Sequence, residues 1–148
     1  MNEAEYRKAL LEVLIGLEQQ VLDQLELAIQ HLPEKTRGIE LMIFPDQDGE
    51  GTFSLRVVLE GLDSFVLNKA IRDYADLISV RHTSSGLVPG VPIMDPFDVE
   101  FQVNDVLSDV IGGWLVKVWE NVDTTDLKLP VTIVTDEGYG HDLPVRLN

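Results

Sequence analysis

Residues 39–60 have the sequence IELMIFPDQDGEGTFSLRVVLE, which is two apolar stretches separated by a turn rich in Asp and Gly. From Phe53 to Glu60, Phe53, Leu55, Val57 and Leu59 face one way and Ser54, Arg56 and Glu60 the other, with the period of two that is typical of a strand with one buried face. The segment Asp46–Gly51 has the composition of a tight turn. The pattern therefore predicts an antiparallel β-hairpin, with strands from Ile39 to Phe44 and from Thr52 to Glu60.

Three other segments have the apolar spacing of three and four residues that is typical of helices. The first extends from about Glu3 to Leu32 and should end at Pro33, which cannot continue a helix. The second extends from about Phe65 to Ile78, with Ser64 as its cap. The third is capped by Asn104 or Asp105 and continues to about Val122. The region from Arg81 to Pro96 is expected to be a loop, because it is interrupted by Gly86, Pro89, Gly90 and Pro92.

Further strands are predicted in the C-terminal half of the chain. Val99–Val103 alternates briefly, and Leu129–Thr135 and Leu143–Leu147 should form a closing pair. The order of elements is then α-β-β-α-(β)-α-β-β. Residues 1–148 should form a single α+β domain, with an antiparallel sheet of four to five strands in two hairpins and three helices packed mainly on one face.

Composition excludes several classes of function. The chain has 148 residues, 26 acidic against 11 basic, and a formal net charge of −15. Nucleic acids and anionic membranes need a basic surface, so neither is expected as a partner. There is no cysteine, which excludes disulfides, thiol catalysis and Cys-ligated metals. We expect a cytoplasmic protein.

Catalytic motifs are absent. The sequence contains no phosphate-binding G-x-x-x-x-G-K-[ST] loop, no G-x-G-x-x-G fingerprint, no G-x-S-x-G elbow and no H-E-x-x-H zinc motif. No nucleophile, base or cofactor can be nominated from spacing. The sequence therefore favours a non-enzymatic protein without a cofactor.

Two acidic loops leave a metal-dependent alternative open. Hard divalent cations are held by several oxygens that converge on one point. The hairpin turn and the loop before the last strand could supply them if both lie at the same edge of the sheet, although the turn fails as an EF-hand because its twelfth position is Val57. The alternative is a carboxylate metal-binding protein or a metal-dependent hydrolase that uses Asp46, Asp48, Glu50, Asp136, Glu137 and His141.

The acidic excess is concentrated in the last sixty residues. Residues 89–148 contain 11 acidic and 3 basic residues, a net charge of −8. Such a surface attracts cationic proteins and speeds their encounter. Small acidic proteins without catalytic groups are typical of inhibitors of basic enzymes, including bacterial immunity proteins that neutralise toxin nucleases. The predicted partner-binding residues are Asp95, Asp98, Glu100, Asp105, Asp109, Asp136, Glu137 and Asp142, with Trp119 or Tyr139 as the aromatic anchor.

Apolar residues also exceed what a one-sided α+β domain needs. The first helix has a second apolar stripe with Leu11 and Ile15, the third helix has Trp119 away from its inner stripe, and Met42 and Phe44 should point to the outer face of the sheet. Exposed apolar patches usually mark contact surfaces. We expect one of them to form a homodimer, unless a third layer covers it.

Overall fold

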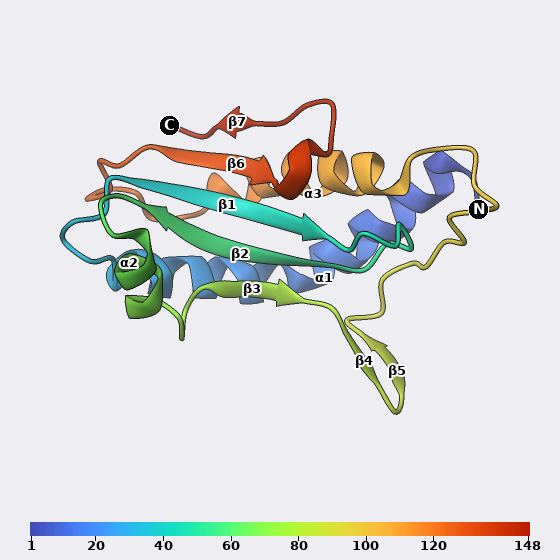
Figure 1. Ribbon diagram of the computed structural model, residues 1–148, viewed down its shortest axis with the longest axis horizontal. Helices are drawn as coiled ribbons and strands as arrows, with labels where there is room; N and C mark the ends of the chain where they lie inside the picture. The colour runs from blue at the N-terminus through green and yellow to red at the C-terminus, as the bar shows by residue number, and fades with distance from the viewer.

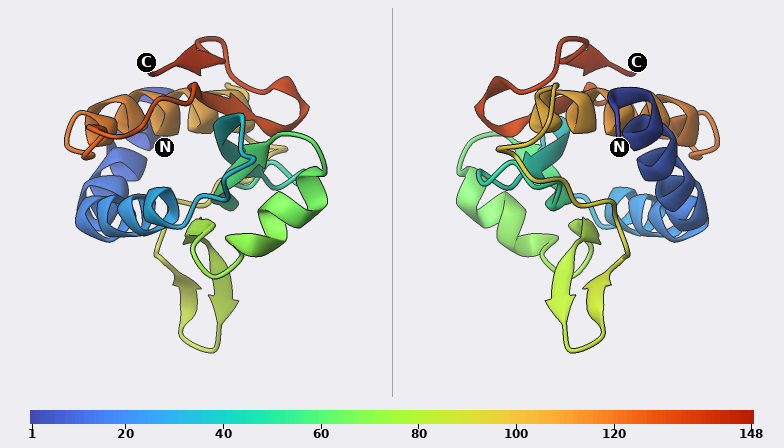
Figure 2. Two further views of the ribbon diagram at one scale, coloured as in Figure 1. Left: turned by 90° about the vertical axis from the view of Figure 1, so that its left-hand side faces the viewer. Right: turned by 90° about the vertical axis from the view of Figure 1, so that its right-hand side faces the viewer.

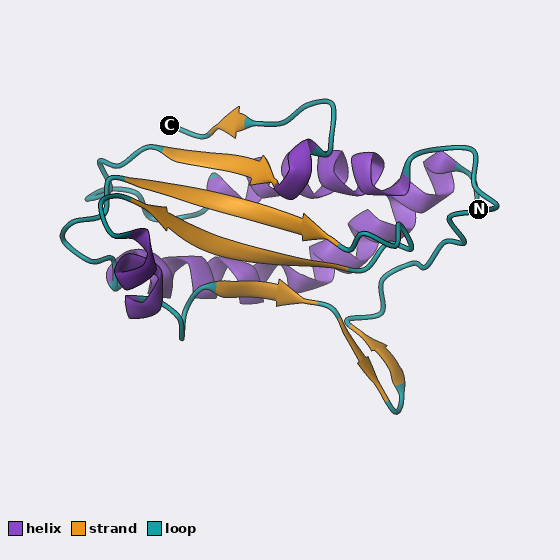
Figure 3. Ribbon diagram, viewed as in Figure 1, coloured by secondary structure: helices purple, strands orange, loops and turns teal.

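The computed structural model describes all 148 residues and has an α+β fold, as predicted (Figures 1 and 3). It contains a five-stranded sheet and a separate two-stranded sheet. The helices are α1 (Glu3–Gln30), α2 (Ser64–Ala70), α3 (Val103–Trp119) and a short 3₁₀ helix, η1 (Asp136–Gly138). The strands are β1 (Gly38–Pro45), β2 (Phe53–Glu60), β3 (Asp76–Ser79), β4 (Arg81–Thr83), β5 (Gly86–Val88), β6 (Val131–Thr135) and β7 (Val145–Arg146).

The large sheet has the strand order β3-β2-β1-β6-β7. The predicted hairpin of β1 and β2 is confirmed, with Leu41 opposite Val57. One pairing differs from the antiparallel prediction, because β1 and β6 run parallel, with Leu41 also opposite Ile133. The cause is α3, which carries the chain back along the sheet, so that β6 begins at the same end as β1. The carboxyl ends of β1 and β6 therefore lie at one edge of the sheet.

Helices α1 and α3 pack together on one face of the sheet (Figure 2). Alternate residues of the central strands are buried beneath them, as the period of two requires. One contiguous core joins both layers. Its fully buried side chains include Leu10 and Leu14 of α1, Leu41 and Ile43 of β1, and Leu107 of α3.

The first helix begins with a capping box. The Asn2 side chain accepts a hydrogen bond from the Glu5 backbone N–H over 2.9 Å, and the Glu5 carboxylate accepts one from the Asn2 N–H over 3.1 Å. Together they satisfy two of the amide groups that a helix start leaves without partners. The helix ends at Gln30, near the predicted boundary.

The second helix is shorter than predicted. It ends at Ala70, and Asp76–Ser79 forms strand β3 instead of its last turn. Leu77 and Ile78 are adjacent in sequence and both are buried. A short apolar pair of this kind fits a strand packed on the core as well as a helix, so the spacing did not distinguish the two. Ser64 is the first residue of the helix and does not cap it, because Asp63 occupies the cap position.

The segments between β3 and the end of α3 also differ from the sequence prediction. The expected loop after β3 contains the β4–β5 hairpin, which projects from the body of the molecule (Figure 1). Residues 99–103 form no strand, because Val103 already begins α3 and Gln102 is its N-cap. Asn104 and Asp105 therefore lie in the first turn of the helix instead of capping it, and the helix ends at Trp119.

Candidate functional site

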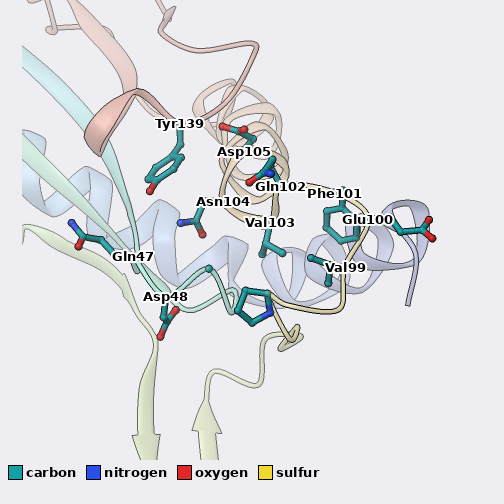
Figure 4. A pocket seen from close by; sticks show the side chains of 12 residues that line it. Gln47, Asp48, Val99, Glu100, Phe101, Gln102, Val103, Asn104, Asp105 and Tyr139 are labelled. Atoms are coloured by element: carbon teal, nitrogen blue, oxygen red, sulfur yellow. The ribbon is translucent and has the colours of Figure 1, made fainter.

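A cavity of about 480 Å³ lies at the edge of the sheet where β1 and β6 both end. Its walls come from the hairpin turn after β1, from the loop before α3, from the first turn of α3 and from Tyr139 after η1 (Figure 4). The parallel pairing brings these segments together, since it places the residues after Pro45 beside those after Thr135. We call this space the acidic cavity, after the residues that line it.

Three carboxylates line the acidic cavity and no cation does. They belong to Asp48, Glu100 and Asp105, and none of the twelve lining residues is Lys, Arg or His. Asp48 accepts a hydrogen bond from the Glu50 N–H over 3.1 Å, whereas Glu100 is exposed and makes no hydrogen bond within the protein. The negative charge of the cavity is therefore left without an internal counter-charge.

Asn104 lines the same cavity and has an unused hydrogen-bond acceptor. Its side chain is only 7 % exposed, and its Nδ2 donates to the Asp46 carbonyl over 3.0 Å. Its Oδ1 is buried and has no hydrogen-bond partner. Figure 4 shows the side chain extending from α3 toward Gln47, Asp48 and Tyr139. A buried acceptor without a donor costs free energy, so a bound N–H group would be favoured here.

The loop from Asp136 to Asp142 is held against α3 by two aspartates. Asp105 accepts a hydrogen bond from the Gly140 N–H over 2.9 Å, and Asp109 accepts from the N–H groups of His141 and Asp142 over 2.9 and 3.0 Å. Gly140 has a φ of 92°, and a Cβ there would lie 2.8 Å from the Asp109 carboxylate. Glycine is therefore required at this position both for its backbone conformation and for the close approach to α3.

An aromatic pair supports the cavity wall. Phe101 lines the cavity and packs at a tilt against Tyr6, with ring centroids 5.5 Å apart. Tyr6 is fully buried, and this burial raises the pKa of its hydroxyl far above the ordinary value. Tyr6 therefore remains neutral and serves as packing.

The two acidic loops meet, but they form no metal-ligand cluster. Gln47 Nε2 donates a hydrogen bond to Glu137 Oε1 over 2.9 Å, which joins the two loops. Nevertheless, no group of three or more His, Asp or Glu side chains is placed to hold a metal ion. The Asp46 carboxylate accepts the hydroxyl of Thr52 instead. The geometry gives no support to the metal-dependent alternative.

The predicted partner-binding residues are divided among several surroundings. Glu100, Asp105 and Tyr139 line the acidic cavity. Glu137 lies beside it through Gln47, whereas the carboxylate of Asp109 is used internally by the neighbouring loop. The others are exposed, with Asp136 at the start of η1 and the rest in loops, namely Asp95, Asp98 and Asp142.

Trp119 cannot be the exposed aromatic anchor that its spacing suggested. It is only 9 % exposed and belongs to the core between the helices and the sheet. Helix α3 packs against both α1 and the sheet, so it buries side chains on more than one of its faces. Tyr139, which is half-buried at the cavity, is the remaining candidate.

Asn104 lines the acidic cavity, although its sequence position predicted a role as a helix cap. It was expected to cap the third helix, because Asn is a common N-cap residue. Its position one residue inside the helix turns its side chain toward the hairpin instead. The apolar Val103 and Val106 on either side of Asn104 and Asp105 were the only sequence signal of a buried role.

The exposed apolar patches that predicted a homodimer are only partly present. Leu11 and Ile15 of α1 are exposed, by 38 % and 56 %, and Met42 and Phe44 are half-buried on the outer face of the sheet. The homodimer therefore stays a prediction. No helix is both long and apolar enough to cross a lipid bilayer.

Comparison with known proteins places the chain in a family but gives no activity. A model of a family of unknown function (DUF6389) matches residues 1–148, the whole chain. The chain belongs to this DUF6389 family. Neither the curated proteins nor the solved structures give a match. The acidic cavity and its chemistry are therefore the basis for a functional hypothesis about this DUF6389 protein.

Proposed function

We propose that this protein is a non-enzymatic cytoplasmic binding module that receives a cationic group of a basic protein partner in the acidic cavity. An immunity or inhibitor role, in which the partner is a basic enzyme such as a toxin nuclease, is the most specific form of this proposal. The observation that carries it is the combination of three carboxylates, no cation and an unpartnered buried acceptor around one cavity.

The donors of Lys and Arg side chains complement this combination. Both side chains present only N–H donors, three for Lys and five for Arg, and neither has an acceptor. A guanidinium or ammonium group in the cavity would neutralise Asp48, Glu100 and Asp105 while donating to Asn104 Oδ1. Charge-assisted hydrogen bonds of this kind are about twice as strong as neutral ones.

The surrounding charge supports the encounter as well as the contact. The chain has a net charge of −15, and exposed acids such as Asp98, Asp136 and Asp142 lie in the loops at the same end as the cavity. Complementary charge of this kind raises association rates and makes them depend on ionic strength. A partner would therefore be drawn to the end of the molecule at which α3 begins.

A salt series with basic nucleases tests the proposal. The expected result is binding that weakens as salt increases, and that is reduced about tenfold or more, ~1.4 kcal/mol, by E100Q combined with D48N. The matched control is E120Q combined with D126N, which removes the same charge from exposed positions after the opposite end of α3.

Two results would overturn the proposal. One is an equal loss of affinity in both double variants, because it would mean that only net charge matters. The other is the absence of binding to any basic nuclease in the panel at low salt. A nuclease of similar size but acidic charge serves as the negative control for the panel.

A further inference from the structure

A second cavity, of about 430 Å³, lies between α1 and α3 and has the opposite electrostatic character. Its cations are Arg7 and Lys8 from α1 and Lys117 from the last turn of α3. The two helices hold these residues in place because they pack against each other on the sheet (Figure 2). We call this space the cationic groove.

The positive charge of the groove is unusual in this chain. Three of the eleven basic residues line one cavity in a protein with a net charge of −15. Lys8 and Lys117 make no ion pair, and Arg7 pairs only with the exposed Glu3 one helical turn away, over 3.0 Å. Exposed pairs of this type are weak, so Arg7 remains able to bind another anion.

The groove contains a single acid, whose oxygens already accept hydrogen bonds from the protein backbone. Asp109 lies among the lining residues, but its carboxylate accepts hydrogen bonds from the backbone N–H groups of His141 and Asp142. These bonds satisfy much of the acceptor capacity of the carboxylate. Asp109 keeps its negative charge, but it stands against three cations, so the groove has a net positive charge.

The remaining lining is apolar and open. Leu11 and Val110 form part of the wall, and Trp114, which is 4 % exposed, lies at its buried side. Gly113 is exposed, and a Cβ at this position would meet no atom within 4 Å. An apolar surface thus lies directly beside the three cations.

We propose that the cationic groove binds a small amphipathic organic anion, with a carboxylate or sulfonate group on an aromatic or alkyl body. The anionic group would lie between Lys8 and Lys117, and the apolar body would cover Leu11 and the open position at Gly113. The volume is within the range of about 300–1,000 Å³ that is typical of small-molecule sites. A partly apolar cavity with a few charged groups is also the usual composition of such sites.

Fluorescence titration with 1-anilinonaphthalene-8-sulfonate tests this site, since the probe is an aromatic sulfonate of the proposed class. The uncharged N-phenyl-1-naphthylamine is the control for charge. We expect the sulfonate to bind at least tenfold more tightly than the neutral probe and to be displaced by decanoate. Near-ultraviolet circular dichroism verifies that the protein is folded in each titration.

Two helical glycines give a matched pair of variants. G113L places a side chain in the groove, whereas G16L places the same side chain on α1 at a position that is equally open. Both changes replace an exposed helical glycine by a better helix former, so both proteins should fold. We expect G113L to weaken sulfonate binding at least tenfold and G16L to leave it unchanged. The K8Q and K117Q double variant should weaken binding of the sulfonate but not of the neutral probe.

Three outcomes would overturn the inference. Equal affinities for the sulfonate and the neutral probe would show that the cations take no part. Equal binding by G113L and the unmodified protein would place the probe elsewhere. Binding of polyglutamate in the absence of any binding of the sulfonate or of decanoate would indicate a groove for an acidic peptide instead of a small anion.

Discussion

Gln47 and Glu137 are 90 positions apart in the sequence, yet Gln47 Nε2 donates a hydrogen bond to Glu137 Oε1 over 2.9 Å. Gln47 follows β1 and Glu137 follows β6. Their contact is a direct consequence of the parallel pairing of the two strands, in which Ile43 lies opposite Thr135. This contact joins two of the segments that border the acidic cavity.

Cross-linking should capture this contact in solution. The chain has no cysteine, so the double variant Q47C/E137C would contain only the two intended thiols. We expect a short bismaleimide to link them within one molecule, which mass spectrometry detects after proteolysis. The control variant Q47C/E120C places the second thiol after the far end of α3 and should give no internal link. Linking of both pairs to the same extent would contradict the parallel arrangement.

Removal of the Asp109 carboxylate should loosen the loop from Gly140 to Asp142. Hydrogen bonds to charged groups contribute about 1.5–3 kcal/mol, so D109A should lower the free energy of unfolding by about that amount. Hydrogen exchange at the amides of His141 and Asp142, which donate to Asp109, should become faster. D126A removes an exposed acid that makes no side-chain hydrogen bond, and it should change neither quantity. Unchanged exchange in D109A would refute this role.

Asn68 should be a stabilising residue, because its side chain takes the place of a neighbouring strand. Its Oδ1 accepts from the Leu59 N–H over 2.8 Å, and its Nδ2 donates to the Leu59 carbonyl over 3.1 Å. N68A leaves both backbone groups without these partners and should cost about 1–3 kcal/mol in urea denaturation. N121A, at an exposed position without side-chain hydrogen bonds, is the control. Equal midpoints for the two variants would argue against this interpretation.

Glu40 should make stability depend on pH. Burial first, and then the neighbouring charge and hydrogen bond of Glu60, raise the pKa of Glu40 above its ordinary value. The folded protein thus holds this proton at a pH at which the unfolded chain has lost it. The stabilisation is complete below the unfolded pKa and is lost as the pH rises through the folded pKa.

The variant E40Q should therefore raise Tm at pH 7 and lose this advantage as the pH falls toward the unfolded pKa. E60Q should give part of the same gain, and the two gains should not add, because the residues are in contact. Thermal melts measure both effects over a pH range from about 4 to about 8, which begins near the ordinary pKa of a Glu carboxyl group. A gain for E40Q that is independent of pH would contradict the assigned cause.

Local periodicity was sufficient to predict the helices and strands that bury only one face. The period of two from Phe53 to Leu59 predicted β2, and the long apolar stripe predicted α1, because each pattern reports which side chains face the core. Gly138 and Gly140 have positive φ, at 74° and 92°, a conformation that glycine adopts without steric cost. In these segments local conformation and tertiary packing favour the same structure.

Periodicity failed where both neighbouring residues are buried or where packing reverses a local preference. Leu77 and Ile78 fit a helix by spacing, yet they form β3, because the edge of the sheet was free to pair with them. The spacing placed Trp119 away from the inner stripe of its helix, but Trp119 is buried because α3 packs against both α1 and the sheet. The apolar pattern of a segment predicts the structure of that segment alone and does not show which other helices or strands pack against it.

The sequence by itself determined the α+β class, the main hairpin, the long first helix and the acidic character of the chain, since these depend on residue type and local spacing. Only the tertiary structure decided that β6 pairs parallel to β1, that Asn104 points toward the hairpin turn, and that Lys8 and Lys117 face a common groove. These are relationships between residues far apart in the chain. They depend on how the helices and strands pack, because packing brings distant side chains within contact distance.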